Sequence, residues 1–134
     1  MRNIVVDTGP LVALFSGRDR DHARVVRFLA ENPCMLLTTW LVATEAWHLL
    51  SAPARLGFMR WVVEGGAAVF DLGMDGGAKM LALLEKYRDR PMDLADASLV
   101  VLAERSGVGE ILTIDRADFD VYRLSRGRGF VQVL

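Results

Sequence analysis

The chain has 134 residues, which is the size of a single domain, and we expect one domain over residues 1–134. Sixteen basic and 17 acidic residues give a formal net charge of −1, a balance that neither demands nor excludes a nucleic-acid partner. Because Cys34 is the only cysteine, an intrachain disulfide and a cysteine-based metal site are excluded. The chain shows neither a signal-peptide pattern nor an apolar run long enough to span a membrane, so we expect a cytoplasmic protein without a membrane partner.

Predicted strands and helices alternate along the chain. Apolar runs predict strands at residues 3–7, 34–37, 67–72, 110–114 and 130–134. Helical patterns interrupted by glycine and proline predict helices at residues 10–15, 20–31, 40–51, 53–64, 75–89 and 92–107. Thr38 or Thr39 is expected to cap the third helix, and an aspartate-rich turn is expected after the fourth strand. Strands that alternate with helices predict a three-layer α/β/α fold with a mainly parallel central sheet.

The first strand ends in the tripeptide D-T-G at Asp7, which is also the signature of aspartic proteases. Those proteases are built almost entirely from strands and bring two such loops together. Here Pro10 starts a helix directly after the tripeptide, so the sequence context argues against a protease.

Two aspartates follow strands that we expect to be parallel. Asp7 ends the first strand, and Asp115 ends the fourth in "ILTID". Ligands of parallel α/β sheets bind beyond the carboxyl ends of the strands, so both carboxylates are expected at one edge. Either residue alone is as well explained as a cap of the following helix or turn, and it is the pair that indicates a site.

Two further acidic positions lie on predicted helices. Glu45 has apolar neighbours at Val42, Ala46 and Leu49, so its carboxylate needs either water or a partner such as a metal ion. Asp93 and Asp96 are three residues apart and share one helix face near its start. Asp93 is also well placed to act only as the N-cap of that helix.

Four carboxylates from four separate elements, none with an evident basic neighbour, indicate a cation site. They repel one another unless a cation joins them, and Mg²⁺ or Mn²⁺ is the ion that prefers oxygen ligands. Such an ion activates water and stabilises an in-line phosphoryl displacement, so phosphodiester hydrolysis is the expected reaction. The four residues are Asp7, Glu45, Asp96 and Asp115.

The segments "VVDTGPLVAL", "TEAWHLL", "MDLADASLVVLAE" and "ILTIDRADF" together resemble a PIN-domain ribonuclease, especially the VapC-type toxins of toxin–antitoxin pairs. The resemblance runs from residue 4 to about residue 120, with the motifs in order. It implies a PIN-like fold, an Mg²⁺- or Mn²⁺-dependent endoribonuclease, a homodimer, and inhibition by a cognate antitoxin protein. Carried over to this sequence, it gives the catalytic acids Asp7, Glu45, Asp96 and Asp115, of which Asp7, Asp96 and Asp115 would bind metal, with Thr113 as the threonine of the T-x-D motif. Asp93 and Asp118 are possible additional ligands, because each lies three residues from a motif acid.

The basic C-terminal segment contains Arg116, Arg126 and Arg128. It has two interpretations that the sequence leaves open. These arginines form either a solvated loop or a rim that contacts RNA phosphates beside the acidic site.

Two other functions are compatible with parts of the pattern. One is a non-catalytic PIN-like domain that binds RNA or protein, although retention of all four acids argues against it. The other is an aspartate-dependent phosphatase or phospho-acceptor protein that uses Asp7 or Asp71. Such phosphatases usually carry a second acid two residues later, where this chain has Gly9, and phospho-acceptor proteins need a lysine that does not follow "ILTID".

Overall fold

The computed structural model describes all of residues 1–134. Its elements follow one another in the order β1 (Arg2–Val6), α1 (Thr8–Phe15), α2 (His22–Glu31), β2 (Cys34–Thr39), α3 (Trp40–Leu49), α4 (Ala52–Val63), β3 (Ala67–Phe70), α5 (Gly73–Lys86), α6 (Leu94–Ser106), β4 (Glu110–Leu112), α7 (Arg116–Val121), the short 3₁₀ helix η1 (Ser125–Gly127) and β5 (Val131–Gln132). None of the helices combines the length and the apolar character that a membrane crossing needs.

The five strands form one sheet in the order β3-β2-β1-β4-β5. All four strand pairs are parallel, so the expected mainly parallel sheet is confirmed and is in fact wholly parallel. β1 is central, and its residues Ile4, Val5 and Val6 are at most 1% exposed, as expected for a strand covered on both faces. Asp7 therefore follows the middle strand of the sheet and lies at the centre of its carboxyl edge.

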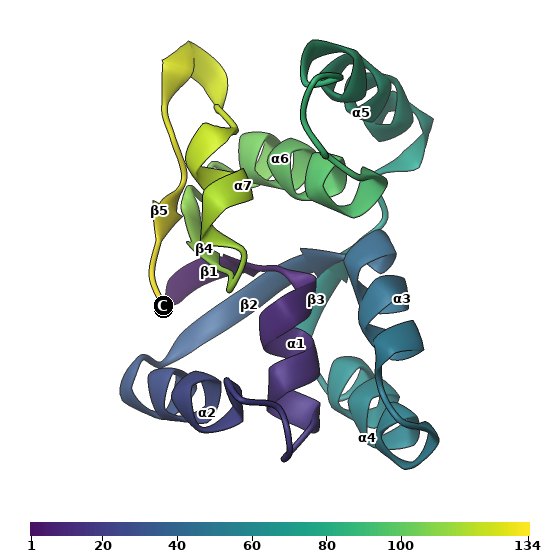
Figure 1. Cartoon of the computed structure of the whole chain (residues 1–134), viewed down its shortest axis with the longest axis vertical. Coiled ribbons are helices and arrows are strands. Elements are labelled where there is room, and N and C mark those ends of the chain that lie inside the picture. Colours follow the sequence, from purple (N-terminus) through teal and green to yellow (C-terminus); the bar gives the residue numbers. More distant parts are fainter.

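Helices cover both faces of the sheet, which confirms the predicted three-layer α/β/α fold (Figure 1). α1, α2 and α4 lie on one side, and α5, α6 and α7 lie on the other. α3 packs against α1 and also against α6, so it lies beside the carboxyl edge of the sheet and connects the two outer layers. This position brings Glu45 of α3 to the same cleft as Asp7, which follows β1.

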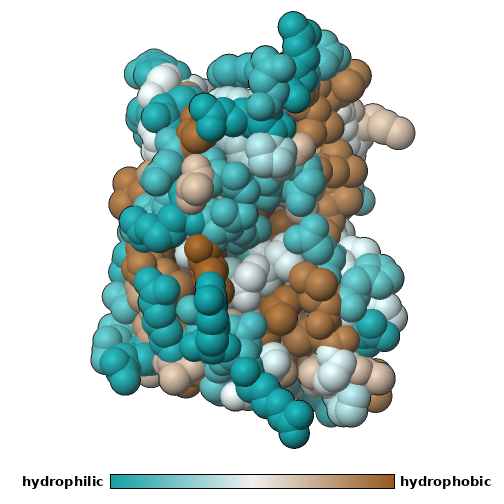
Figure 2. Space-filling view, viewed as in Figure 1, coloured by the Kyte–Doolittle hydropathy of each residue, from teal (hydrophilic) through white to brown (hydrophobic).

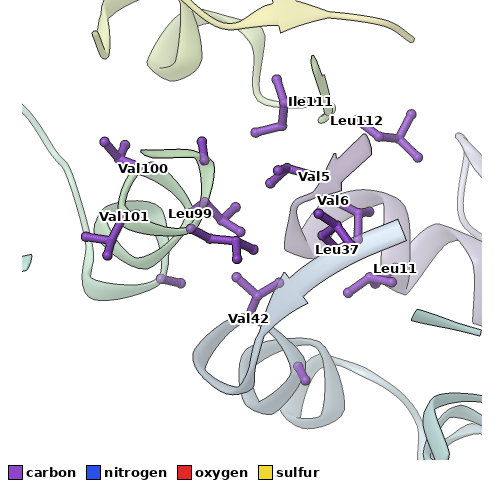
Figure 3. Packing of buried hydrophobic residues seen from close by; sticks show 14 of the residues in the cluster. Val5, Val6, Leu11, Leu37, Val42, Leu99, Val100, Val101, Ile111 and Leu112 are labelled. Atoms are coloured by element: carbon purple, nitrogen blue, oxygen red, sulfur yellow. The ribbon is translucent and has the colours of Figure 1, made fainter. Parts of the chain in front are cut away.

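The centre of the hydrophobic core lies between α6 and the sheet. Every residue of α6 from Ala95 to Ala103 is buried. Figure 3 shows side chains of β1 and β2 between Leu99 of α6 and Leu11 of α1, with the side chains of β4 above them. Full burial of a leucine such as Leu99 stabilises the fold by about 1.5–3 kcal/mol. This packing fixes α6, and with it the orientation of the acidic residues in its first turn.

The structure corrects one predicted element and adjusts the bounds of several others. The aspartate-rich segment after β4 is not only a turn, because residues 116–121 form α7. Phe119 and Tyr122, each 1% exposed, supply apolar contacts that stabilise this short helix, and the three charged residues of α7 obscured their spacing of three residues. β2 extends to Thr39, whose side chain accepts a hydrogen bond from the backbone of Val42 and caps α3 as predicted. α1 begins at Thr8, so Pro10 is the third helical residue, where its missing N–H is still not needed.

Candidate active site

The predicted acids line one cleft at the carboxyl edge of the sheet. The cleft has a volume of about 530 Å³, and no lysine or arginine is among its lining residues. Its acidic lining residues are Asp7, Asp19, Asp21, Glu45, Asp93, Asp96, Asp115 and Asp118. All six acids proposed from the sequence as catalytic or metal-binding thus come together from β1, α3, α6 and the start of α7.

Asp7 is held by backbone and side-chain hydrogen bonds at the end of β1. Its backbone N–H donates to the carbonyl of Leu112 at 3.0 Å, which extends the pairing of β1 with β4. The Thr113 hydroxyl donates to Oδ2 of Asp7 at 3.0 Å, and the backbone N–H of Asp115 donates to that hydroxyl at 3.0 Å. Thr113 is 2% exposed. One threonine therefore positions both Asp7 and the backbone that carries Asp115, which explains the T-x-D spacing.

Asp7 is only 7% exposed as a residue, and the pKa of its carboxyl group reflects this burial. Burial raises the pKa of Asp7 to about 6, and the negative charges of Glu45 and Asp115 add to the rise. The backbone of Thr8 and the hydroxyl of Thr113 oppose it by hydrogen bonding. A nearby cation would favour the ionised form that these surroundings disfavour.

Asp93 and Asp96 have different roles in the first turn of α6. Asp93 is the N-cap, because its Oδ1 accepts the backbone N–H of Asp96 at 2.8 Å, and this local role was predicted. Asp96 is 9% exposed, and its Oδ2 accepts a hydrogen bond from the Tyr122 hydroxyl at 2.9 Å. Burial first, and the charge of Asp93 second, raise the pKa of Asp96 to about 7, with smaller contributions from Asp7 and Asp118. The hydrogen bond from Tyr122 opposes the rise.

Asp115 and Asp118 lie together at the beginning of α7. Asp115 is exposed at the N-cap position, and Asp118 is half-buried in the first turn. A hydrogen bond between the two carboxyl groups raises the pKa of Asp118 to about 6, and burial adds to the rise. Both side chains line the cleft, where a bound cation would favour their ionised forms.

Glu45 completes the cleft from the side of α3, where its side chain is half-buried. The adjacent helix residue Ala46 is fully buried, so the helix face that carries Glu45 adjoins the core. Of the two predicted environments for this carboxylate, water or a buried partner, the structure shows a position at the wall of the open cleft.

Asp19 and Asp21, in the loop between α1 and α2, were not predicted to reach the cleft. The Asp19 carboxylate accepts the backbone N–H of Asp21 at 2.8 Å. Asp21 forms ion pairs with Arg20 at 3.5 Å and Arg24 at 3.9 Å. These contacts serve the loop itself, so the charges of this pair are partly compensated, in contrast to the charges at the sheet edge. No sequence motif marks them, because only the path of the loop brings them to the site.

The three arginines considered for RNA contact lie outside the cleft lining. Arg116 is exposed at the first position of α7, and its Nη1 donates to the carbonyl of Leu134 at 3.4 Å. Arg126 and Arg128 are exposed on the loop around η1, where Arg126 has a left-handed backbone with φ of 63°. Arg116 therefore directly follows Asp115, whereas Arg126 and Arg128 belong to a separate segment around η1.

The donor set fits a hydrated divalent cation. Every charged group at the sheet edge offers oxygen, and the Thr8 hydroxyl is buried without a hydrogen-bond partner although it lines the cleft. No three acidic, histidine or cysteine side chains stand close enough together to enclose an ion as they are. Mg²⁺ usually keeps several of its waters and binds one or two carboxylates, so an open acidic cleft is the arrangement it uses.

Comparison with known proteins agrees with the fold and the acidic cleft. The family model described as the PIN domain matches residues 4–124, and the chain belongs to this family. Ribonuclease VapC26 from Mycobacterium tuberculosis is 28% identical to this chain, over 97% of this chain and 99% of its own length. The predicted family is therefore confirmed.

Solved structures show the same fold. The VapC20 toxin of Mycobacterium tuberculosis, described as cleaving the sarcin-ricin loop, superposes with a TM-score of 0.78 at 22% identity, covering 84% of this chain and 89% of its own. A toxin–antitoxin complex from Klebsiella pneumoniae gives a TM-score of 0.67 at 20% identity, covering 98% and 96% of the two chains. FitAcB from Neisseria gonorrhoeae gives 0.56 at 17% identity, covering 87% and 90%.

Proposed function

We propose that this PIN-domain protein is a metal-dependent endoribonuclease that hydrolyses phosphodiester bonds of RNA, and that it is the toxin of a toxin–antitoxin pair. The observation that carries the proposal is the single cleft in which Asp7, Glu45, Asp96 and Asp115 meet without a basic side chain. The names of its relatives support the same activity, because VapC26 is called a ribonuclease and VapC20 a toxin that cleaves the sarcin-ricin loop.

In this proposal Asp7, Asp96 and Asp115 would hold a hydrated Mg²⁺ or Mn²⁺, and Asp93 and Asp118, which line the same cleft, are the possible additional ligands. When bound, the ion supplies a Lewis acid and lowers the pKa of a bound water. Without the ion, burial and mutual repulsion disfavour the ionised forms of Asp7 and Asp96. Binding of a cation is then favoured by relief of that repulsion.

The remaining groups position the reactants. Thr113 fixes the carboxylate of Asp7 by its hydrogen bond at 3.0 Å. Glu45 presents a half-buried carboxylate from the opposite wall, where it orients the attacking water or accepts its proton.

RNA binding requires positive charge, and none comes from the cleft lining. We assign this role to Arg116, which is adjacent to Asp115, together with Arg126 and Arg128 on the loop after α7. Loss of one phosphate contact should make the negative slope of log affinity against log salt shallower by about 0.7 for single-stranded RNA. Arg116→Gln tests this directly.

We also propose that the partners are a cognate antitoxin and a second copy of the chain, and that the protein acts on RNA in the cytoplasm. The Klebsiella pneumoniae relative was solved as a toxin–antitoxin complex. Large apolar side chains are exposed on α3 and α4, namely Trp40, Leu49, Leu56 and Val63. Figure 2 shows hydrophobic residues gathered on this part of the molecule, between α1, α3 and α4, which suits a protein contact.

The test is cleavage of cellular RNA by the purified protein with Mg²⁺ or Mn²⁺ and with EDTA. Asp7→Asn and Asp96→Asn should abolish metal-dependent cutting. Asp89→Asn, an exposed acid outside the cleft, is the matched control and should cut like the wild type. Equal cutting by all four proteins, or cutting that survives EDTA, would refute the proposal. RNA binding without cutting would favour the non-catalytic PIN-like domain, and hydrolysis of a phosphomonoester instead of RNA would favour the phosphatase.

A further inference from the structure

Tyr122 is a buried side chain that no sequence motif identified and that none of the roles above uses. It follows the last residue of α7 and is 1% exposed. Its ring packs edge-on against Phe119, with 5.2 Å between centroids, and against Tyr87, with 5.3 Å between centroids. A tyrosine ring held on two sides in this way has little freedom, and its hydroxyl must find a partner inside the protein.

That partner is a carboxylate of the acidic cleft. The Tyr122 hydroxyl donates to Oδ2 of Asp96 at 2.9 Å, in buried surroundings. Asp96 lies in the first turn of α6, whose buried face from Ala95 to Ala103 fixes the helix against the core. The hydrogen bond therefore joins Asp96, on a helix packed against the core, to Tyr122, whose ring packs against two other aromatic rings.

The same contact connects the acid of α6, Asp96, to α7, which carries Asp118 and directly follows Asp115. α7 begins immediately after Asp115, carries Asp118 in its first turn, and ends immediately before Tyr122. Its far end thus contacts Asp96, while its near end presents the other acids. A displacement of α7 would move both groups of carboxylates relative to each other.

We propose that Tyr122 is a positioning residue for the divalent cation: its hydroxyl engages Oδ2 of Asp96, so that Oδ1 would remain available as a ligand. This inference rests on the proposed function, because it assumes that Asp96 is a metal ligand. Hydrogen bonds to ligating carboxylates orient them, and removing such a partner typically weakens metal affinity or activity by about 10–100-fold. A tyrosine hydroxyl suits this position because it donates one hydrogen bond without adding a charge.

The experiment is direct titration with Mn²⁺, followed by the loss of the electron paramagnetic resonance signal of the free ion. The proteins are the wild type, Asp96→Asn, Tyr122→Phe and Tyr87→Phe. Tyr87→Phe is a matched control, because Tyr87 is also buried and packs on Tyr122, but its hydroxyl accepts the backbone N–H of Arg123 rather than contacting an acid. Circular dichroism in the same buffer verifies folding, and an excluded osmolyte added equally to all samples restores a variant that is partly unfolded.

Tyr122→Phe should weaken Mn²⁺ binding about tenfold or more, while Tyr87→Phe stays within about twofold of the wild type. In RNA cleavage, the Mn²⁺ concentration for half-maximal rate should rise in parallel for Tyr122→Phe only. Wild-type Mn²⁺ affinity in Tyr122→Phe, or equal losses in both phenylalanine variants, would overturn the positioning role and leave the proposed function intact. Wild-type Mn²⁺ binding by Asp96→Asn would likewise overturn the positioning role, because Asp96 would then not be a ligand. Absence of Mn²⁺ binding by the wild type would overturn both proposals, so the two failures are distinguishable.

Discussion

Replacing Asp7 with asparagine should stabilise the metal-free protein above neutral pH, although the same change should abolish activity. The side chain keeps its size but loses a negative charge at the centre of the sheet edge, where it is 7% exposed. Burial and the nearby charges raise the pKa of Asp7 from 3.8 to about 6 in the folded protein. The folded state therefore binds the Asp7 proton more tightly than the unfolded chain does.

The sign of the pH dependence follows from this difference. Between about pH 4 and pH 6 the folded protein holds a proton that the unfolded chain has released, so wild-type stability falls as the pH rises through this range. A pKa increase of this size corresponds to about 3 kcal/mol once both states are ionised. The asparagine amide replaces an oxygen with a donor and loses part of the hydrogen bonding near Thr8, at a cost of about 1 kcal/mol. The net gain expected for Asp7→Asn is therefore about 2 kcal/mol near pH 8.

The assay is urea unfolding in EDTA at fixed protein concentration, at about pH 4.5 and about pH 8, where the group is mainly protonated and mainly ionised. At the lower pH, Asp7→Asn should be equal to the wild type or up to about 1 kcal/mol less stable. Asp89→Asn, an exposed control, should change little at either pH.

A difference in unfolding free energy between Asp7→Asn and wild type that is the same at both pH values would refute the argument. It would show that folding does not disfavour the ionised form of Asp7. Saturating Mg²⁺ should reverse the order near pH 8, since the ion stabilises only a protein that can bind it.

Three further predictions concern the cation, the threonine of the T-x-D motif and the core. Mg²⁺ at about 100 times its Kd should stabilise the wild type by about 2.7 kcal/mol over EDTA, and thermal unfolding of Asp96→Asn should show a much smaller shift; an equal shift would place the ion elsewhere. Thr113→Val should reduce RNA cleavage by about 10–100-fold because Asp7 loses its donor. Thr38→Val, which removes a buried hydroxyl bonded only to a backbone carbonyl, should reduce stability but not cleavage, and similar cleavage by both variants would contradict the assigned role of Thr113. Leu99→Ala should destabilise the protein by about 2–5 kcal/mol in urea unfolding, against about 0.5 kcal/mol or less for exposed Leu56→Ala; comparable losses would show that α6 is not central to the core.

Local features of the fold were predictable from the sequence. The positions of β1 and of α6 follow from apolar runs and helical patterns, which reflect hydrogen bonding and side-chain direction within a few residues. The N-cap role of Asp93 is local in the same sense, because its acceptor and the donor on Asp96 are three residues apart. Asp7 and Asp115 were placed at one edge because parallel strands bring their carboxyl ends together, a rule that needs only the order of elements.

The short helix α7 shows where local patterns failed. Three of its six residues are charged, and its fully buried apolar contacts come from Phe119 and from Tyr122, which directly follows the helix. An isolated helix of this length is not stable in water, so its formation depends on what it packs against. The sequence carries the residues of that contact but does not state that the contact is made.

The sequence by itself determined the alternation of elements, the family and the four acids that the cleft contains. Only the tertiary structure decided how those acids are held: Thr113 bonds to Asp7 across 106 residues of sequence, and Tyr122 bonds to Asp96 across 26. It also brought Asp19 and Asp21 to the cleft. Periodic patterns record which face of an element is buried, because that depends on backbone geometry alone. Contacts between distant side chains depend on the packing of whole layers, which is settled by the free energy of the complete fold and by no single segment.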